Sequence, residues 1–559
     1  MNFTAVYTNT ASQSRRSERD SHIFSIAFWA LLVVYCAWVF WLPEFPTQDG
    51  PVHLYYTRVM AHLFSGSPLF SQFFAVRWPP PPYAIHYFLL LFLTSFLPAA
   101  AAEKVIVCLA IILLATGFRY LATAIGPTGK QMSLWVLPLT LNWMLGMGFH
   151  NYLLSLGLSL WAMGLWLRAV ERRAVRLWVM YLVLAAVMLV THPVPLLMLL
   201  GIVACDIAVR ALNKFRSSAG QQSWTAAFTG LKPDLLFFLA SCLLASYILL
   251  FVDRSKTSNN LQNSFLSPRM LLDFVRLRPL GLTTGNNISR LYRLMFYPLL
   301  LIAILTGLRG FGSRWKEARL APRDLFVALS IAFAVVFPLL PRSINGSDFF
   351  SDRLVIYIWI LALAAASARV GNLLIRPWSA ALAVCLAVFA LVLSDHFVRP
   401  VAKALVADER MAGPAPGERG VFLSPTVDFD PTLDRGVMLS YDPFVWSAAR
   451  YFRRTNTIML NAPWLDLPIL PVAPRGDMFA NLFPRTNDYP DKFYDKLTKS
   501  EDVRRRVEQL AQFVVLIKYP GYKRFESTMP SWIKQLHCGP GEYFSLCTVT
   551  DSQAWFPSK

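Results

Sequence analysis

The sequence has little charge and, in particular, little acid. Charged residues make up 15% of its 559 positions, against roughly 25% in a typical soluble domain. Hydrophobic residues reach 55%, and the mean hydropathy is +0.44. Runs of about 20 apolar residues, each long enough to cross a hydrocarbon core of roughly 30 Å, recur from Ser25 to Ser394. This composition excludes a soluble multidomain protein and predicts a polytopic α-helical membrane protein.

Cysteine is also scarce, and the seven cysteines lack the spacing of a metal site. Five of them lie in apolar runs and are typical of small core residues. Cys538 and Cys547 lie in a polar carboxyl-terminal segment and flank Gly-Pro-Gly turn chemistry that a hairpin can close. We expect a disulfide between them, provided that this segment lies in an oxidising compartment outside the cytoplasm.

The net charge of +20 does not indicate a nucleic-acid partner. Arg and Lys cluster in short loops between apolar runs, where positive charge marks the cytoplasmic side of a membrane. Basic residues precede the first run, 23–42, and the loop 168–176 carries four Arg against one Glu. The first run lacks a small-residue cleavage site, so it is typical of a retained span. We therefore expect a multi-pass protein of a bacterial-type inner membrane, with a cytoplasmic amino terminus and an external loop at 43–82.

The alternation of basic loops predicts eleven spans. They fall at 23–42, 83–98, 105–124, 132–167, 177–192, 194–212, 235–252, 291–308, 325–340, 354–368 and 377–394. The run 132–167 is long enough for two spans, but two would place the four-Arg loop outside. We expect one net crossing there, with a broken or re-entrant piece near 146–151 that lines a protein cavity. Thirteen spans stay an alternative if another run is split.

Residues 395–559 differ in composition from the rest of the chain. They are rich in Pro, Asp and Arg, and short apolar stretches at 420–424, 457–460 and 513–518 are typical of strands. An amphipathic helix is predicted at 494–512. We expect a membrane module at 1–394 and a soluble, extracytoplasmic α/β domain at 395–559.

Acidic residues are informative because only fourteen occur in residues 1–394. An acid close to a bilayer is costly unless it is paired or functional. Six lie in the predicted external segments: Glu44, Asp49, Asp253, Asp273, Asp348 and Asp352.

Asp49 stands out among these because Asp-Gly-Pro-Val-His53 follows the first span and opens an amphipathic helix. Pro51 suits the first turn of a helix, and the Asp49 side chain can cap the free amides of that turn. The alternatives are a general base oriented by His53, or a metal-binding carboxylate. The Asp-x-x-x-His spacing is common by chance, so the pattern alone leaves these alternatives open.

Taken together, these segments resemble the GT-C glycosyltransferase superfamily of polytopic enzymes, which use polyprenyl-phosphate-linked sugars on the outer face. The resemblance rests on Asp49-Gly-Pro-Val-His53, on the return Trp78-Pro-Pro-Pro-Pro-Tyr83, and on Asp352-Arg353-Leu-Val-Ile-Tyr357 at the start of a late span. An external α/β tail also fits. Two departures are visible: Leu354 replaces a Tyr found in several GT-C families, and Asp49 lacks the adjacent acid that many families have.

The resemblance implies transfer of a sugar from a polyprenyl-phosphate donor to an envelope glycan, lipid or protein. A lipid phosphate leaves without protonation, so the reaction needs a base for the acceptor hydroxyl and fixed positive charge for the phosphate. We predict Asp49 as the base, assisted by His53, and Arg353 as the bidentate phosphate ligand. Further candidate substrate-binding residues are Asp352, His192, Tyr83, Arg290 and Arg293.

Roles outside catalysis and substrate binding stay open for several of these candidates. The arginines of the loop up to residue 293 are also suited to pairing with lipid headgroups, and His192 to a hydrogen bond at a helix end. His86 and His150 have no assigned role. The motifs specify no cofactor, and a divalent cation stays an alternative.

Two other classes of protein are also compatible with the sequence. A transporter or flippase of a lipid-linked substrate would need buried charges inside its spans and often has a duplicated half. The apolar runs hold few ionisable groups, and no internal repeat is visible. A non-catalytic envelope assembly protein acting through its tail is the third class.

Overall fold

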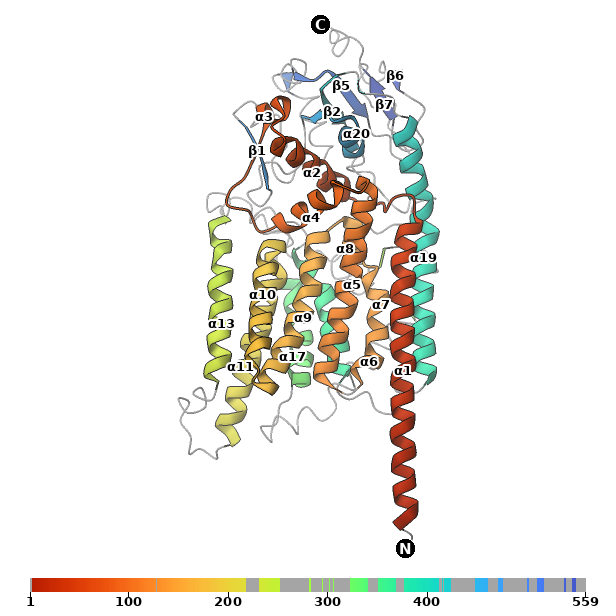
Figure 1. The fold of residues 1–559 in the computed structure, drawn as a ribbon, viewed down its shortest axis with the longest axis vertical. Coiled ribbons are helices and arrows are strands. Elements are labelled where there is room, and N and C mark those ends of the chain that lie inside the picture. The colour runs from red at the N-terminus through yellow and green to blue at the C-terminus, as the bar shows by residue number, and fades with distance from the viewer. Residues whose placement is uncertain are drawn as a thin grey trace.

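The computed structural model describes most of the helical part of the chain and parts of the tail. The described residues are 3–126, 128–217, 231–251, 281–282, 294, 301, 305, 322–339, 350–367, 377–411, 415, 417–423, 448–460, 471–475, 500–501, 510–516, 537–538 and 545–548. Long helices pack side by side in a bundle, and a small sheet lies at one end of it (Figure 1). The amino terminus projects from the opposite end, which we call the N-terminal end of the bundle.

The first helix leads to a group of short elements at the other end of the bundle. Helix α1 (Phe3–Trp41) is followed by α2 (Gly50–Phe64), α3 (Pro68–Phe73), β1 (Phe74–Val76), α4 (Ala84–Thr94) and then the long helix α5 (Ala99–Ile125). We call this end, where α1 finishes and α2 lies, the α2 end. The predicted external loop 43–82 therefore forms a folded layer across one end of the bundle (Figure 1).

The predicted span at 83–98 is wrong. Helix α4 has 11 residues, which is about 16 Å and too short for a bilayer core. Both of its ends lie at the α2 end. Near its start, the His86 ring lies 4.6 Å from that of His53 in α2. Just beyond its end, α5 begins at the same level, since Thr47 Oγ1 donates to Glu103 Oε1 over 2.5 Å.

The run 132–167 contains two traverses of the bundle where the sequence predicted one net crossing. The first is broken into α6 (Gly129–Met132), η1 (Ser133–Val136), α7 (Leu137–Thr140) and α8 (Trp143–Met147), and the second is α9 (His150–Arg172). The Thr128 hydroxyl donates to the Ser367 carbonyl at the N-terminal end, whereas the Met147 carbonyl accepts from Asp49 N–H at the α2 end. The break expected near 146–151 is present, as a sharp reversal at Gly148 (φ 83°). Because α4 does not cross, the four-Arg loop still lies at the N-terminal end.

Most of the later predicted spans coincide with helices. These are α10 (Val175–Thr191), α11 (Pro193–Ser217), α13 (Lys232–Ala245) with η2 (Ser246–Phe251), α17 (Pro322–Val336) with η4 (Phe337–Leu339), α18 (Phe350–Ala366) and α19 (Pro377–Met411). The predicted span 291–308 lies outside the described part of the chain, apart from three single positions.

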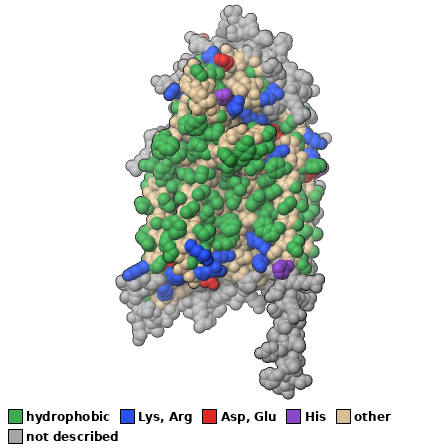
Figure 2. All heavy atoms as spheres, in the orientation of Figure 1, with side chains coloured by type: hydrophobic (Ala, Val, Ile, Leu, Met, Phe, Trp, Pro, Cys, Tyr) green, Lys and Arg blue, Asp and Glu red, His purple; other side chains and the backbone are tan. Residues whose placement is uncertain are grey.

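Six of the described helices are long and apolar enough to cross a membrane. They are His22–Trp41, Ala99–Ile125, His150–Arg172, Pro193–Phe215, Lys232–Leu250 and Ser379–Ala407. The bundle surface carries a band of hydrophobic side chains with Lys and Arg gathered beyond both of its edges (Figure 2). Ile26, Val33 and Leu236 are each at least 65% exposed within this surface, as expected of side chains that face lipid. The chain is an integral membrane protein.

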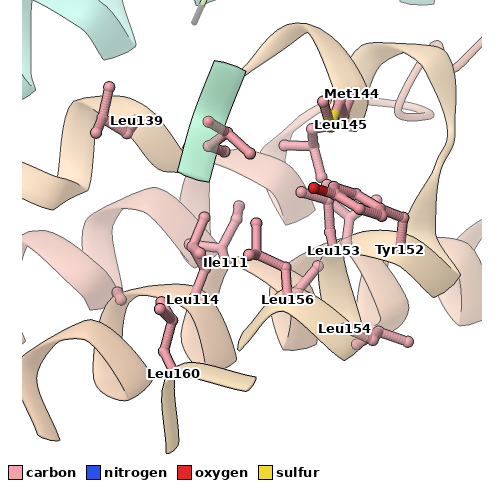
Figure 3. Close-up of a cluster of buried hydrophobic side chains, with 14 of the residues drawn as sticks. Ile111, Leu114, Leu139, Met144, Leu145, Tyr152, Leu153, Leu154, Leu156 and Leu160 are labelled. Atoms are coloured by element: carbon pink, nitrogen blue, oxygen red, sulfur yellow. The ribbon is translucent and has the colours of Figure 1, made fainter. Parts of the chain in front are cut away.

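The interior is packed by leucine and aromatic side chains. Ile111 and Leu114 of α5 face Leu153, Leu156 and Leu160 of α9, with α7 and α8 residues closing the cluster (Figure 3). This core holds the broken segment 129–147 against the two long helices. The position of the reversal at Gly148 is therefore set by core packing.

The described part of the tail is a mixed α/β unit. Its five-stranded sheet has the order β3 (Ile458–Met459), β2 (Arg419–Leu423), β5 (Phe513–Leu516), β7 (Ser545–Thr548) and β6 (His537–Cys538). Strand β2 is parallel to β3 and β5, and β7 is antiparallel to its neighbours. The predicted strands coincide with β2, β3 and β5, while most of the predicted helix 494–512 lies outside the described residues. Helix α19 continues through residue 394 to Met411, so the domain boundary stays a prediction.

The tail contacts α2 on the side that faces away from the bundle. Strand β4 (Val472–Pro474) pairs with β1, and the Tyr55 hydroxyl of α2 accepts from Met459 N–H over 2.8 Å. Arg450 of α20 (Ala448–Thr455) forms an ion pair with Glu44, and both side chains are buried. Helix α2 is thus enclosed between the bundle and the tail.

Candidate active site

Asp49 occupies the N-cap position of α2 and is held there by its backbone. Its N–H donates to the Met147 carbonyl over 3.0 Å, and the N–H of Gln48 donates to the Gly146 carbonyl over 2.9 Å. The side chain is 5% exposed and makes no capping hydrogen bond. The capping role that the sequence left open is therefore not the role of this carboxylate.

The close approach of Asp49 to the reversal depends on Gly148. This residue has φ +83°, and a Cβ placed on it would lie 2.8 Å from the Gly50 nitrogen and 3.2 Å from the Asp49 Cβ. Glycine alone combines the left-handed conformation with the missing side chain. The start of α2 therefore rests directly on the turn that leads into α9.

His53 is hydrogen-bonded to groups from two other segments. Its Nδ1 lies 2.8 Å from the Tyr87 hydroxyl of α4, and its ring donates to the Gly148 carbonyl. Burial lowers the pKa of His53 well below its ordinary value of 6.5, and positive charge on His86 or His150 would lower it further. His53 is therefore a neutral residue at the junction of α2, α4 and α9, and its assistance to Asp49 stays a prediction.

Arg353 lies near the start of α18 and is 6% exposed. Its guanidinium carbon is 4.9 Å from the Phe149 ring and 5.7 Å from the Tyr152 ring. The Tyr152 hydroxyl donates to the Arg353 carbonyl over 2.7 Å, which fixes the start of α18 against α9. Asp49 and Arg353, separated by three hundred residues of chain, thus contact consecutive parts of one segment, 147–152.

Two further predicted residues lie beside Arg353. His192 separates α10 from α11, and its Nδ1 accepts from Val194 N–H over 3.2 Å. Its ring lies 4.6 Å from that of Tyr83, which directly precedes α4, and 5.3 Å from that of Tyr152. The structure therefore brings Tyr83, His192 and Arg353 together around Tyr152. The hydrogen bond from Val194 to His192 also agrees with the alternative role for His192, a structural hydrogen bond at a helix end.

Other predicted residues cannot be placed in the site. The backbone of Asp352 lies in α18 next to Arg353, but its side chain is outside the described part, as are Arg290 and Arg293. Cys538 and Cys547 are register partners of the antiparallel strands β6 and β7, and the bond between them stays a prediction.

Sequence reasoning missed Glu103, Tyr87 and Arg450. Glu103 is 1% exposed and lies beneath the first turn of α2. It was not counted among the external acids because a span at 83–98 would have placed it at the opposite end of the bundle. The sequence around Tyr87 and Arg450 carried no sign of a functional role. Tyr87 lies in an apolar helix and Arg450 in a basic amphipathic helix, and helices of both kinds are common as purely structural elements.

The described residues do not form a metal site. Among them, no group of three or more His, Cys, Asp or Glu side chains could hold a metal ion. Within this part of the chain, the divalent cation that the sequence left open therefore has no ligand set.

The fold is shared with a solved membrane enzyme. No protein-family model and no curated protein sequence matches the chain. The crystal structure of ArnT from Cupriavidus metallidurans bound to undecaprenyl phosphate matches 95% of this chain and 99% of its own, with a TM-score of 0.51 and 13% identity. The apo form of that protein matches the same shares with a TM-score of 0.49 and 12% identity. ArnT is a GT-C glycosyltransferase, so the GT-C resemblance predicted from the sequence is confirmed at the level of the fold.

Proposed function

We propose that the protein is a GT-C-type glycosyltransferase that moves a sugar from a polyprenyl-phosphate donor to an acceptor hydroxyl at the α2 end of the bundle. The observation that carries the proposal is the placement of Asp49 and Arg353 on consecutive parts of the segment 147–152. The ArnT structure with undecaprenyl phosphate supports a polyprenyl phosphate as the carrier. An envelope glycan, lipid or protein is the proposed acceptor.

In this reaction Asp49 accepts the proton of the acceptor hydroxyl as the new bond to the sugar forms. The bond between the sugar and the phosphate breaks, and the lipid phosphate leaves with the electron pair. Arg353 neutralises the charge that develops on the phosphate oxygens. Its packing on two aromatic rings orients the guanidinium before substrate binds, because a cation is attracted to an aromatic face.

We further propose that the α2 end is extracytoplasmic and that the chain has eleven spans. The two corrections to the predicted topology leave the number of spans unchanged. Helix α4 is removed as a span, and the segment 129–172 supplies two spans where one was predicted. The crossing between α13 and α17 would be made by 291–308. Support comes from the four-Arg loop, which lies at the same end as the amino terminus and has the charge of a cytoplasmic loop. Residues 395–559 would then be an external domain.

The experiment that tests the function is an Asp49→Asn exchange. Mass spectrometry of lipid-linked sugars that accumulate in a strain lacking the protein identifies the donor, and the purified protein is then assayed with it. We expect kcat to fall by at least about 100-fold, the usual contribution of a general base, with unchanged thermal unfolding. Asp395→Asn is the matched control, because Asp395 pairs with Arg399 on α19 outside the site. Undiminished turnover by Asp49→Asn would remove Asp49 as the base.

A further inference from the structure

Two consecutive residues of α5, Glu103 and Lys104, contact the two ends of the connection between α1 and α2. Both side chains are buried. Lys104 Nζ donates to the carbonyls of Phe40 and Leu42, where α1 ends. Glu103 Oε1 accepts from the Thr47 hydroxyl over 2.5 Å, shortly before α2 begins. The proposed reaction gives neither Glu103 nor Lys104 a role.

The charges of these two residues match the helix ends that they contact. The carbonyls at the end of a helix carry partial negative charge, and the amides at its start carry partial positive charge. Lys104 therefore suits the end of α1, and Glu103 suits the start of α2. A buried acid close to a bilayer is costly unless it is paired or functional, so the position of Glu103 calls for an explanation.

Glu103 lies directly against the first turn of α2. A Cβ placed on Gly50 would overlap both Glu103 Oε1 and Thr47 Oγ1. The missing side chain of Gly50 thus lets the carboxylate of another helix reach this turn. Because Thr47 is fully buried, its hydroxyl depends on Glu103 for a hydrogen-bond acceptor. Glu103 thereby contacts residues that come before and after Asp49 in the chain.

The segment 47–50 is held from a second side by the turn between α8 and α9. The N–H groups of Gln48 and Asp49 donate to the Gly146 and Met147 carbonyls. The side chain of Gln48 also lies next to the candidate base, with its Nε2 3.5 Å from Asp49 Oδ1. The backbone hydrogen bonds fix one side of the segment and Glu103 fixes the other. A rotation of the segment about those backbone bonds would move the Asp49 carboxylate, and the contacts of Glu103 oppose such a rotation.

We propose that Glu103 is a positioning residue for Asp49, which it holds in place through its hydrogen bond to Thr47 and its contact with Gly50; this inference rests on the proposed function. Asp49 makes no capping hydrogen bond to α2, and Glu103 supplies negative charge at the helix start from a different helix. A general base must lie within hydrogen-bond reach of the proton that it takes. A misplacement of about 1 Å can lower a rate about 100-fold.

The test is Thr47→Val, which removes the hydroxyl that binds Glu103 and changes the volume little. We expect kcat to fall about 10-fold, because Asp49 is less well placed, with KM for the lipid-linked donor unchanged. Thr47→Ser restores the hydroxyl and should restore kcat. Amide hydrogen exchange at residues 48–50 should be about 10-fold faster in Thr47→Val, which is roughly the effect of one hydrogen bond.

Thr128→Val is the matched control. Thr128 is also a buried threonine, and its hydroxyl donates to the Ser367 carbonyl, which links two distant segments at the opposite end of the bundle. We expect this variant to keep its kcat and its exchange rates at 48–50. Normal kcat together with normal exchange in Thr47→Val would overturn the proposed role of Glu103.

Glu103→Asp tests the same contact from the other partner and serves if Thr47→Val fails to fold. It keeps the negative charge but withdraws the carboxylate by one methylene, so kcat should again fall about 10-fold. The double variant Thr47→Val/Glu103→Asp should be no slower than the slower single variant, because both changes remove one contact. Losses that multiply in the double variant would contradict the proposal.

Two further outcomes separate this inference from the proposed function. An inactive Asp49→Asn variant with normal kcat in both Thr47→Val and Glu103→Asp would overturn the positioning role and leave the function intact. Undiminished turnover by Asp49→Asn would remove Asp49 as the base, whatever the exchange rates at 48–50. If Glu103→Asp loses as much activity as Asp49→Asn while Thr47→Val is normal, Glu103 acts on substrate itself and is not a positioning residue.

Discussion

At the scale of single residues, backbone contacts hold the groups whose side chains are needed for chemistry. Asp49 is fixed by the hydrogen bond from its N–H to Met147, and the start of α18 is fixed by the bond from Tyr152 to the Arg353 carbonyl. Neither of these bonds uses the carboxylate or the guanidinium. Preorganised groups of this kind need little rearrangement during a reaction, which is how electrostatic catalysis lowers a barrier.

Arg353 provides a test of phosphate binding at this scale. Arg353→Lys keeps the charge but loses the planar fork that can hold two phosphate oxygens. We expect KM for the lipid-linked donor to rise about 10-fold in Arg353→Lys, and kcat/KM to fall about 100-fold in Arg353→Gln, which corresponds to about 2.7 kcal/mol of transition-state stabilisation. Steady-state kinetics with the donor measure both. Arg58→Lys is the control, since Arg58 bonds to Asn456 on an exposed part of α2. Normal kinetics in Arg353→Gln would contradict the assignment.

At the scale of elements, the reversal between α8 and α9 determines where the start of α2 lies. The left-handed Gly148 lets α8 end and α9 begin within a few residues, and its carbonyl and missing side chain both face the start of α2. A small displacement of this turn would move Asp49 together with it. Activity should therefore be sensitive to the turn, although the turn itself makes no contact with substrate in the proposed reaction.

Gly148→Ala tests this dependence. The variant adds conformational strain of about 1–2 kcal/mol, because the left-handed conformation is unfavourable for a residue with a Cβ. The new Cβ would also lie 2.8 Å from the Gly50 nitrogen, which would have to move. We expect kcat to fall at least 10-fold while the protein still folds, measured by the transfer assay and by thermal unfolding. Gly66→Ala is the control for strain alone, because Gly66 has φ +74° and no atom within 4 Å of the added Cβ. Equal losses in the two variants would show that strain, and not the contact with α2, is responsible.

At the scale of the whole molecule, the tail closes over α2 and meets the bundle through buried charge. Glu44 pairs with Arg450, both almost fully buried, and Glu103 lies beneath the first turn of α2. A buried ion pair adds little net stability, but removing one partner leaves an uncompensated charge at a cost of about 3–5 kcal/mol. The buried ion pair therefore joins the tail to the segment that leads into α2, next to the candidate site.

The compartment of the tail can be tested through Cys538 and Cys547. These residues are opposite each other in β6 and β7, and a disulfide there would stabilise the fold by about 2–3 kcal/mol through so short a loop. We expect neither cysteine to react with a thiol reagent in the denatured, unreduced protein, and both to react after reduction. Cys385 is the internal control, because it is an exposed free cysteine. Full labelling of both tail cysteines before reduction would mean either that the bond is absent or that the tail lies inside.

The sequence by itself determined the class of protein, most of the spans and several residues of the candidate site. Apolar runs and basic loops are local signals of lipid contact and of the side of the membrane on which a loop lies. Short motifs at the ends of the predicted spans identified the candidates Asp49, His53, Tyr83, His192 and Arg353. Only the tertiary structure decided that 83–98 stays at one end of the bundle and that 129–172 crosses twice. An apolar run shows that a segment is buried, but the end to which it returns depends on packing against distant helices. For the same reason no local pattern could bring Tyr87 and His86 of α4 together with His53 of α2 and His150 of α9, since three separate elements supply them.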